Sequence, residues 1–335
     1  MRHKKRFIVY ADFLGTKQRY SKPQLVVRGR ELLEQALDRC VIPRMHADDM
    51  YLYVHSDTAI VTCPRLSPLL EPISDLFSYF LELHGDDRND QMTLWLRAAI
   101  SYGRVLSVDH VQNSDRVRTI PFLDTSLPTA YKLESIRRGS RVFVDPTIPD
   151  EAFRECQELF FKWQQITGHG YHVPNVREYL WPAKIPRDSD RLAKGTIRLN
   201  GLWTKALSKK EWSKDEYNKS MIHLDETLKL FIMTSSLFCS EDRKREVLFS
   251  LLPKSTAPHK NISYKWGVWF QALRGIVENC EMSVSTVQEV ETVFGIARTV
   301  LSNGGYLDHF MGELEFPDYA PFRNALCRLG LHEGE

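Results

Sequence analysis

Two aspartates near the start of the chain have the sequence setting of a metal site. Asp12 ends the apolar run of residues 6–12, and Gly15 follows three residues later. Asp57 lies between two β-rich runs in residues 50–63, a pattern that indicates a hairpin with the aspartate at or near its tip. Two carboxylates close together repel each other unless a divalent cation lies between them. If the hairpin packs beside the first strand, Asp12 and Asp57 therefore predict a Mg²⁺ or Mn²⁺ site.

The turn after Asp12 adds an anion-binding feature to that prediction. A glycine at position 15 allows a tight turn that presents backbone N–H groups to a bound anion. A metal-holding carboxylate beside a phosphate-binding turn is what a nucleoside triphosphate site requires. Taken singly, each aspartate also fits a plainer role, with Asp12 as a helix cap and Asp57 as an ordinary turn residue.

The elements expected to position the aspartates alternate in a recognisable order. Hydrophobic periodicity predicts strands at 6–12, 50–63 (the hairpin), 94–106 (a strand pair, or one strand broken at Gly103) and 141–144, and helices at 24–39, 69–81 and 127–134. The order β-α-β-β-α-β, followed by α-β, predicts an α+β fold of the ferredoxin-like, split βαβ kind. We expect an antiparallel sheet with helices on one face, whose central strands bring Asp12 and Asp57 together.

The character of the chain changes after about residue 150. Six of the seven tryptophans lie beyond that point, and helical periodicity dominates there. We therefore expect a catalytic domain over 1–150 and a mainly helical region over 151–335 that braces the sheet and does no chemistry. Within it, the proline-flanked, charged stretch at 182–200 indicates a long loop.

Composition excludes several classes of protein. The 45 basic and 43 acidic residues nearly balance, which argues against a nucleic-acid coat protein. No apolar run reaches the length of about 18 residues that a transmembrane helix needs, so no membrane association is expected. The six cysteines are scattered without a C-x-x-C motif, which indicates free thiols in a reducing cytoplasm.

Four segments together resemble the class III nucleotide cyclases. Residues 10–17 (YADFLGTK) resemble the first-strand motif of that family, and residues 55–57 match the second metal aspartate of its hairpin. Residues 97–103 resemble the strand after the second helix, and residues 127–135 the helix that carries the transition-state residues. The resemblance covers roughly 6–145, and the form of the first motif is most similar to the pyrimidine nucleotide cyclases of Pycsar antiphage defence.

The resemblance implies a reaction and a cofactor. The reaction is cyclisation of a nucleoside triphosphate to a 3′,5′-cyclic monophosphate with release of pyrophosphate. Two Mn²⁺ or Mg²⁺ ions per site would be held by Asp12, Asp57 and the backbone of Phe13, and the amides of Leu14, Gly15 and Thr16 would hold the β- and γ-phosphates. It also implies a homodimer with sites at the interface, and a separate effector that binds the cyclic nucleotide.

The sequence departs from the purine cyclases at informative positions. Tyr53 stands where they carry a base-reading lysine, and Pro128 and Lys132 stand where they carry the transition-state asparagine and arginine. Lysine carries charge to a phosphate without the bidentate grip of arginine. A further cation is therefore expected to stabilise the α-phosphate, and Arg97 is the first candidate, with Arg137 and Arg138 as alternatives. The expected catalytic residues are Asp12, Asp57, Lys132 and Arg97.

The expected substrate is a pyrimidine nucleotide, because the purine-reading residue is absent and Tyr53 can bound a pocket for a smaller base. We expect UTP to be converted to cyclic UMP, with CTP and cyclic CMP as the alternative. A catalytically inactive nucleotide sensor is a further alternative, favoured by Pro128 and Lys132. A palm-type polymerase or cyclic dinucleotide synthase is less consistent, because no Gly-Gly-Asp-Glu-Phe run is present.

Overall fold

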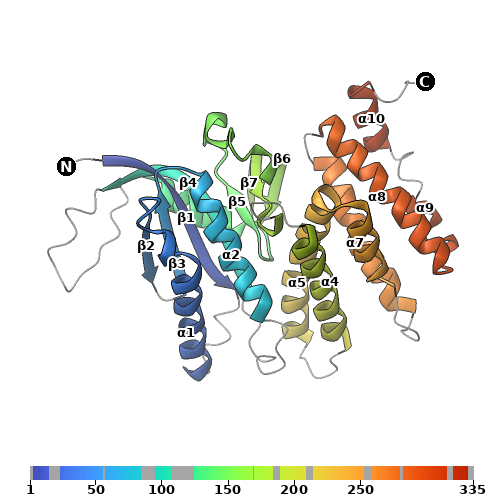
Figure 1. Ribbon diagram of the computed structural model, residues 1–335, viewed down its shortest axis with the longest axis horizontal. Coiled ribbons are helices and arrows are strands. Elements are labelled where there is room, and N and C mark those ends of the chain that lie inside the picture. The colour runs from blue at the N-terminus through green and yellow to red at the C-terminus, as the bar shows by residue number, and fades with distance from the viewer. Residues whose placement is uncertain are drawn as a thin grey trace. The chain divides into compact units, whose positions relative to one another are not determined.

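The computed structural model describes residues 3–14, 23–55, 57–83, 95–106, 124–168, 170–183, 189–208, 214–252, 259–279, 282–314 and 320–330. The chain divides into two compact units, Met1–Lys184 and Ile185–Glu335 (Figure 1). The first unit is built around a β-sheet, and the second is helical. Each is described by itself below.

A seven-stranded sheet in the order β2-β3-β1-β4-β5-β7-β6 forms the first unit. Its strands are β1 (His3–Leu14), β2 (Tyr51–His55), β3 (Thr58–Cys63), β4 (Trp95–Leu106), β5 (Val142–Val144), β6 (Phe160–Gly168) and β7 (Tyr171–Tyr179). Strand β1 runs antiparallel to both of its neighbours, β3 and β4. The order β2-β3-β1-β4 is that of a split βαβ unit, so the predicted fold class is confirmed. Strand β4 continues through Gly103 without a break.

Helices α1 (Pro23–Cys40) and α2 (Ser67–Leu83) confirm the predicted helices and cover one face of the sheet (Figure 1). Alternate residues of a strand point to opposite faces. Val9, Ala11 and Phe13 of β1 therefore share the face that packs against α2, and Phe13 meets Phe80 with 4.9 Å between ring centroids. The side chains packed between this face and α2 are apolar.

Helix α3 (Ser126–Ser135) lies against the opposite face, so the expectation that the helices share one face is wrong. Its Leu127 packs on the cluster of Ile8, Ile60 and Val105, which alternate with the residues that face α2. The reason lies at Gly103 of β4. A Cβ there would come within 2.4 Å of the Cβ of Ser126, so only glycine lets α3 start directly on the strand.

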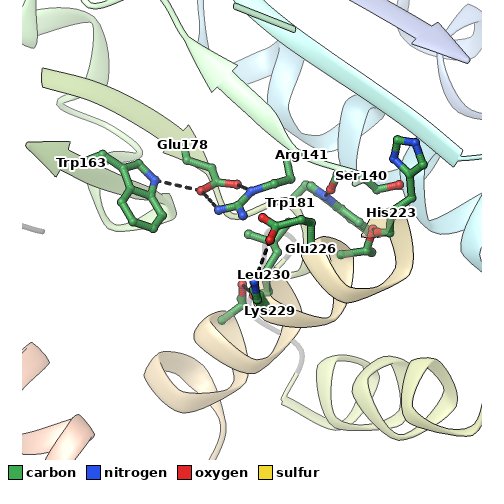
Figure 2. A network of polar contacts seen from close by, with 11 residues as sticks. Ser140, Arg141, Trp163, Glu178, Trp181, His223, Glu226, Lys229 and Leu230 are labelled. Atoms are coloured by element: carbon green, nitrogen blue, oxygen red, sulfur yellow. Dashed lines mark hydrogen bonds and ion pairs between the residues drawn. The ribbon is translucent and has the colours of Figure 1, made fainter. Parts of the chain in front are cut away.

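The hairpin of β6 and β7 extends the sheet beyond residue 150. A buried ion pair fastens it, because both carboxylate oxygens of Glu178 on β7 accept hydrogen bonds from Arg141 at 2.6 Å (Figure 2). Trp163 on β6 donates to the same carboxylate at 2.9 Å. The first unit therefore ends after Lys184, and the mainly helical region begins later than the predicted boundary at residue 150.

The second unit contains helices α4 (Ser189–Ser208), α5 (Lys214–Phe238), α6 (Glu241–Phe249), α7 (His259–Asn279), α8 (Val284–Asn303), α9 (Met311–Leu314) and α10 (Ala320–Arg328). Its core holds an aromatic cluster formed by Trp266, Trp269, Phe270, Phe294 and Phe310. Most of the predicted loop at 182–200 is helix α4. Asp190 and Lys194 of that stretch are exposed, whereas Leu192, Thr196 and Leu199 recur at helical spacing and are buried.

Candidate active site

Asp12 lies near the carboxyl end of the central strand β1, on the face that carries α3. It pairs in register with Thr58 of β3 on one side and Arg97 of β4 on the other. The hydroxyl of Thr58 donates to Asp12 Oδ1 at 3.3 Å, and Arg97 Nη2 lies 3.4 Å from Oδ2. The side chain of Asp12 is 20 % exposed, so the carboxylate is held on both sides while still open to a ligand.

Asp57 lies in the turn that joins β2 to β3, next to the end of β1. The backbone N–H of Phe13 donates to the carbonyl of Asp57 at 3.3 Å, which ties the hairpin tip to the strand that carries Asp12. The predicted proximity of the two aspartates follows from this contact. His55, which precedes the turn, is exposed on β2.

The positive charge around Asp12 is too small to offset the burial of its carboxylate. Burial raises the pKa of Asp12 above its usual value, and the negative charge of Asp57 raises it further, whereas Arg97 and the hydrogen bond from Thr58 act against the rise. Burial also lowers the pKa of Arg97, which Asp12 partly restores. A cation bound beside Asp12 would oppose the rise of its pKa.

The donor set at this edge of the sheet fits Mg²⁺ or Mn²⁺. Within the described ranges, no three His, Cys, Asp or Glu side chains come together as a ligand set. Two carboxylates and the backbone carbonyl of Phe13 are hard oxygen donors, and Mg²⁺ is commonly held by one or two carboxylates with substrate phosphates and water completing its shell. The site therefore suits a metal that arrives with a phosphorylated substrate better than a closed structural metal.

Glu134 was not among the predicted site residues, yet it contacts Arg97, the partner of Asp12. It lies on α3, its side chain is 0 % exposed, and its Oε1 forms an ion pair with Arg97 Nε. A sequence signal existed, because Glu134 occupies a helical position whose neighbours Ala130 and Leu133 are apolar and buried. A charged residue on the buried side of a helix requires a partner.

The other predicted cations have different settings. Lys132 projects from the exposed side of α3, one residue after the exposed Tyr131. The guanidinium of Arg137 lies over the ring of Trp163, 5.1 Å from its centroid. Arg138 is exposed and close enough to Arg97 to lower the pKa of that guanidinium. Of the four cations, Arg97 is the one placed in contact with Asp12.

Tyr53, predicted to bound a base pocket, lies on β2 on the same face of the sheet as Asp12. Its half-buried side chain packs against the cluster of Ile8, Ile60 and Val105. Burial raises the pKa of its hydroxyl, and the charge of Arg6 opposes the rise. Tyr51, which shares this face, stacks under Arg6 with 4.7 Å between the guanidinium carbon and the ring centroid.

Part of the predicted phosphate-binding turn lies outside the described residues. Strand β1 ends at Leu14, and Gly15 and Thr16 belong to the stretch for which no structure is described. Their role in holding phosphates remains a prediction from the sequence. Among the described residues, no helix combines the length and apolar character needed to cross a bilayer.

Comparison with known proteins gives similarity at the level of structure only. No family model matches the chain, and no curated protein matches its sequence. The guanylyl cyclase Cya2 is similar with 13 % identity and a TM-score of 0.38, over 53 % of this chain and 92 % of that one. An adenylate/guanylate cyclase/hydrolase from Silicibacter pomeroyi is similar with 12 % identity and a TM-score of 0.39, over 53 % and 97 %. An adenylate cyclase from Trypanosoma brucei shows 10 % identity and a TM-score of 0.39, over 55 % and 91 %. At this identity the similarity concerns the fold, and the function has to be argued from the site.

Proposed function

We propose that the protein is a metal-dependent nucleotide cyclase that converts UTP to 3′,5′-cyclic UMP and pyrophosphate. The observation that carries this proposal is the meeting of Asp12 and Asp57 at one end of β1, through the bond between the Phe13 N–H and the Asp57 carbonyl. In the reaction the ribose 3′-oxygen bonds to the α-phosphorus, the bond to the bridging oxygen of pyrophosphate breaks, and the hydroxyl proton is released.

The chain's own residues would divide the work between metal and phosphate. Asp12, Asp57 and the carbonyl of Phe13 would hold Mn²⁺ or Mg²⁺, which when bound lowers the pKa of the 3′-hydroxyl and neutralises the triphosphate. Arg97 is 17 % exposed beside Asp12, so its guanidinium is placed to share charge with a phosphate oxygen. Thr58 orients the Asp12 carboxylate through its hydroxyl hydrogen bond.

A homodimer would complete the site. Lys132 and Tyr131 are exposed on α3, beside the face of the sheet that carries Asp12, and an exposed cation there is available to a second copy of the chain. In such a dimer the metal-binding aspartates of one protomer would face Tyr53 and Lys132 of the other. Lys132 would carry charge to the α-phosphate, and Tyr53 would bound the pyrimidine base.

The finer parts of the proposal rest on the resemblance of the sequence motifs to Pycsar pyrimidine cyclases. They are the choice of UTP, the role of the product as a messenger in antiphage defence, a separate effector that binds the product, and a cytoplasmic site of action. Cyclic CMP is the alternative product, because no residue at Tyr53 or around it selects between uracil and cytosine. A catalytically inactive nucleotide sensor is favoured by Pro128 and Lys132, which replace the transition-state residues.

Product identification tests the proposal. Purified protein is incubated with each of the four ribonucleoside triphosphates and Mn²⁺, and the products are identified by mass. A cyclic pyrimidine monophosphate that disappears in Asp57→Ala is the expected result. Metal-dependent binding of a triphosphate without any product would favour the sensor, and a linear or dinucleotide product would favour a polymerase-like palm enzyme.

A further inference from the structure

Glu134 is a buried carboxylate that has one charged neighbour. Its side chain is 0 % exposed, and it pairs with Arg97 through Oε1. Beyond this ion pair, neither of its carboxylate oxygens has a hydrogen-bond partner among the described residues. Removing a carboxylate from water costs several kcal/mol unless it is paired and fully hydrogen-bonded. Stability alone is therefore a poor reason for a glutamate at this position of α3.

The same sheet contains a pair that shows what a purely structural arrangement looks like. Glu178 is 0 % exposed and accepts two hydrogen bonds from Arg141 and a third from Trp163 (Figure 2). Both of its oxygens are satisfied, and none of these three hydrogen bonds involves Asp12 or Asp57. Glu134 has fewer hydrogen bonds than Glu178, and Nη2 of its partner Arg97 lies 3.4 Å from Asp12 Oδ2.

We propose that Glu134 is a positioning residue that compensates the charge of Arg97 and thereby keeps Asp12 available to a divalent cation. This inference rests on the metal site of the proposed function. Asp12, Asp57 and Glu134 supply three negative charges, and Arg97 and its neighbour Arg138 supply two positive charges, so the group carries a net negative charge that a bound cation offsets. Because Glu134 supplies a second negative charge next to Arg97, the guanidinium can lie beside Asp12 without fully neutralising that carboxylate.

Loss of the Glu134 charge changes this balance in two ways that act together. The group loses one negative charge, which weakens its attraction for a divalent cation. Arg97 is also left with Asp12 as its only carboxylate partner among the described contacts, so the guanidinium competes with metal for that oxygen. Removal of both Arg97 and Glu134 charges restores the original net charge and removes the competitor.

Direct measurement of Mn²⁺ binding tests the inference without relying on turnover. Free Mn²⁺ is followed by electron paramagnetic resonance in the presence of 3′-deoxy-UTP, which cannot cyclise. Glu134→Gln is expected to weaken Mn²⁺ binding about tenfold, since one unit charge close to the site is lost. Glu134→Asp is expected to recover part of the affinity, and the double variant of Arg97→Gln with Glu134→Gln most of it, although turnover stays low without Arg97.

Glu178→Gln is the matched control, because it removes an equally buried glutamate charge from an arginine pair away from Asp12. It is expected to lower the unfolding temperature and leave Mn²⁺ affinity unchanged. Should either Gln variant fail to fold, Glu134→Asp and the double variant carry the test. Unchanged Mn²⁺ affinity in Glu134→Gln, equal weakening in Glu178→Gln, or no recovery in the double variant would overturn the inference. Wild-type protein that binds no Mn²⁺ overturns it together with the proposed metal site, whereas the expected binding pattern without any cyclic product overturns only the proposed reaction.

Discussion

The two faces of the sheet in the first unit are built on opposite principles. The face toward α2 is lined by apolar side chains such as Val9, Ile73 and Phe77. The face toward α3 carries Asp12, Arg97 and Glu134 within its packing. Because a strand alternates between faces, the single strand β1 supplies both environments. One face stabilises the fold through burial, and the other holds charges whose burial works against stability.

This contrast teaches where function is to be sought in a fold of this kind. Burial raises the pKa of Asp12 and lowers that of Arg97, so the charged forms of both groups are disfavoured in the isolated molecule. Such unfavourable electrostatics are common at functional sites, because a ligand of complementary charge relieves them. Substitutions on one face at a time can show whether stability and activity depend on different faces of the sheet.

Asp57→Ala is expected to have the largest effect on activity, about 10³-fold or more in kcat, because it removes one of the two carboxylates that we propose to hold metal. The backbone bond from Phe13 uses the Asp57 carbonyl and survives the change, so the unfolding temperature should stay within about 2 °C. Steady-state kinetics with UTP and Mn²⁺ check the first part and calorimetry the second. His55→Ala, an exposed change in the same hairpin, serves as control and should leave kcat unaltered.

Phe77→Ala on the opposite face should reverse that pattern. Phe77 is 2 % exposed and meets Trp181 with 5.1 Å between ring centroids, so its truncation leaves a cavity and should lower the free energy of unfolding by about 3–5 kcal/mol. Urea titration measures the loss. KM for UTP and Mn²⁺ affinity, measured well below the unfolding transition, should be unchanged. A raised KM would show that the two faces are not independent.

Gly103→Ala perturbs the attachment of α3 and should have an intermediate effect. The added Cβ would lie 2.5 Å from Asp124 Oδ1 as well as against Ser126, so the start of α3 has to shift, at a cost of about 1–3 kcal/mol. Hydrogen exchange in α3 should accelerate more than exchange in α2. The control is Gly295→Ala in α8, where an added Cβ meets nothing within 4 Å; it should be neutral or slightly stabilising.

Asp12→Asn should have the smallest effect on stability, and its sign is the informative part. Burial raises the pKa of Asp12 above the value of 3.8 for a free side chain, so the metal-free protein loses stability as the pH rises above that value. Asparagine removes this penalty. The variant should be more stable than wild type at pH 7 without metal, and the gap should close below about pH 4.

Urea titrations of both proteins at the two pH values measure the difference, with EDTA present throughout. A variant that is less stable than wild type at pH 7 would mean that the Asp12 carboxylate is fully compensated by Arg97 and needs no cation. In a separate series without EDTA, added Mn²⁺ should stabilise wild type and leave Asp12→Asn unchanged, since a ligand stabilises the state that binds it.

The sequence predicts the strand order and the meeting of Asp12 with Asp57, because both depend on local patterns. An apolar run that ends in a carboxylate and a hairpin with an aspartate at its tip are each visible within about ten residues. The position of α3 is not visible in this way. It depends on the close approach of Ser126 to Gly103, and glycine in a strand signals close approach without naming the partner.

Two further features were missed for different reasons. The pairing of Arg97 with Glu134 joins β4 to α3, and no local pattern couples these positions. Helix α4 was hidden by the composition around its start, since Asp190, Arg191 and Lys194 lie in its first turns and prolines precede it. Its buried residues Leu192, Thr196 and Leu199 still recur at helical spacing, so periodicity was a better guide there than composition.

The most direct test of the central claim is to locate the metal. Crystals grown with Mn²⁺ and 3′-deoxy-UTP, measured at the manganese absorption edge, show each Mn²⁺ as an anomalous-scattering peak. The account predicts peaks in contact with the carboxylates of Asp12 and Asp57 and with the triphosphate, and their loss in Asp57→Ala. Nucleotide bound with its triphosphate away from Asp12 and Asp57, or Mn²⁺ bound elsewhere on the chain, would contradict it.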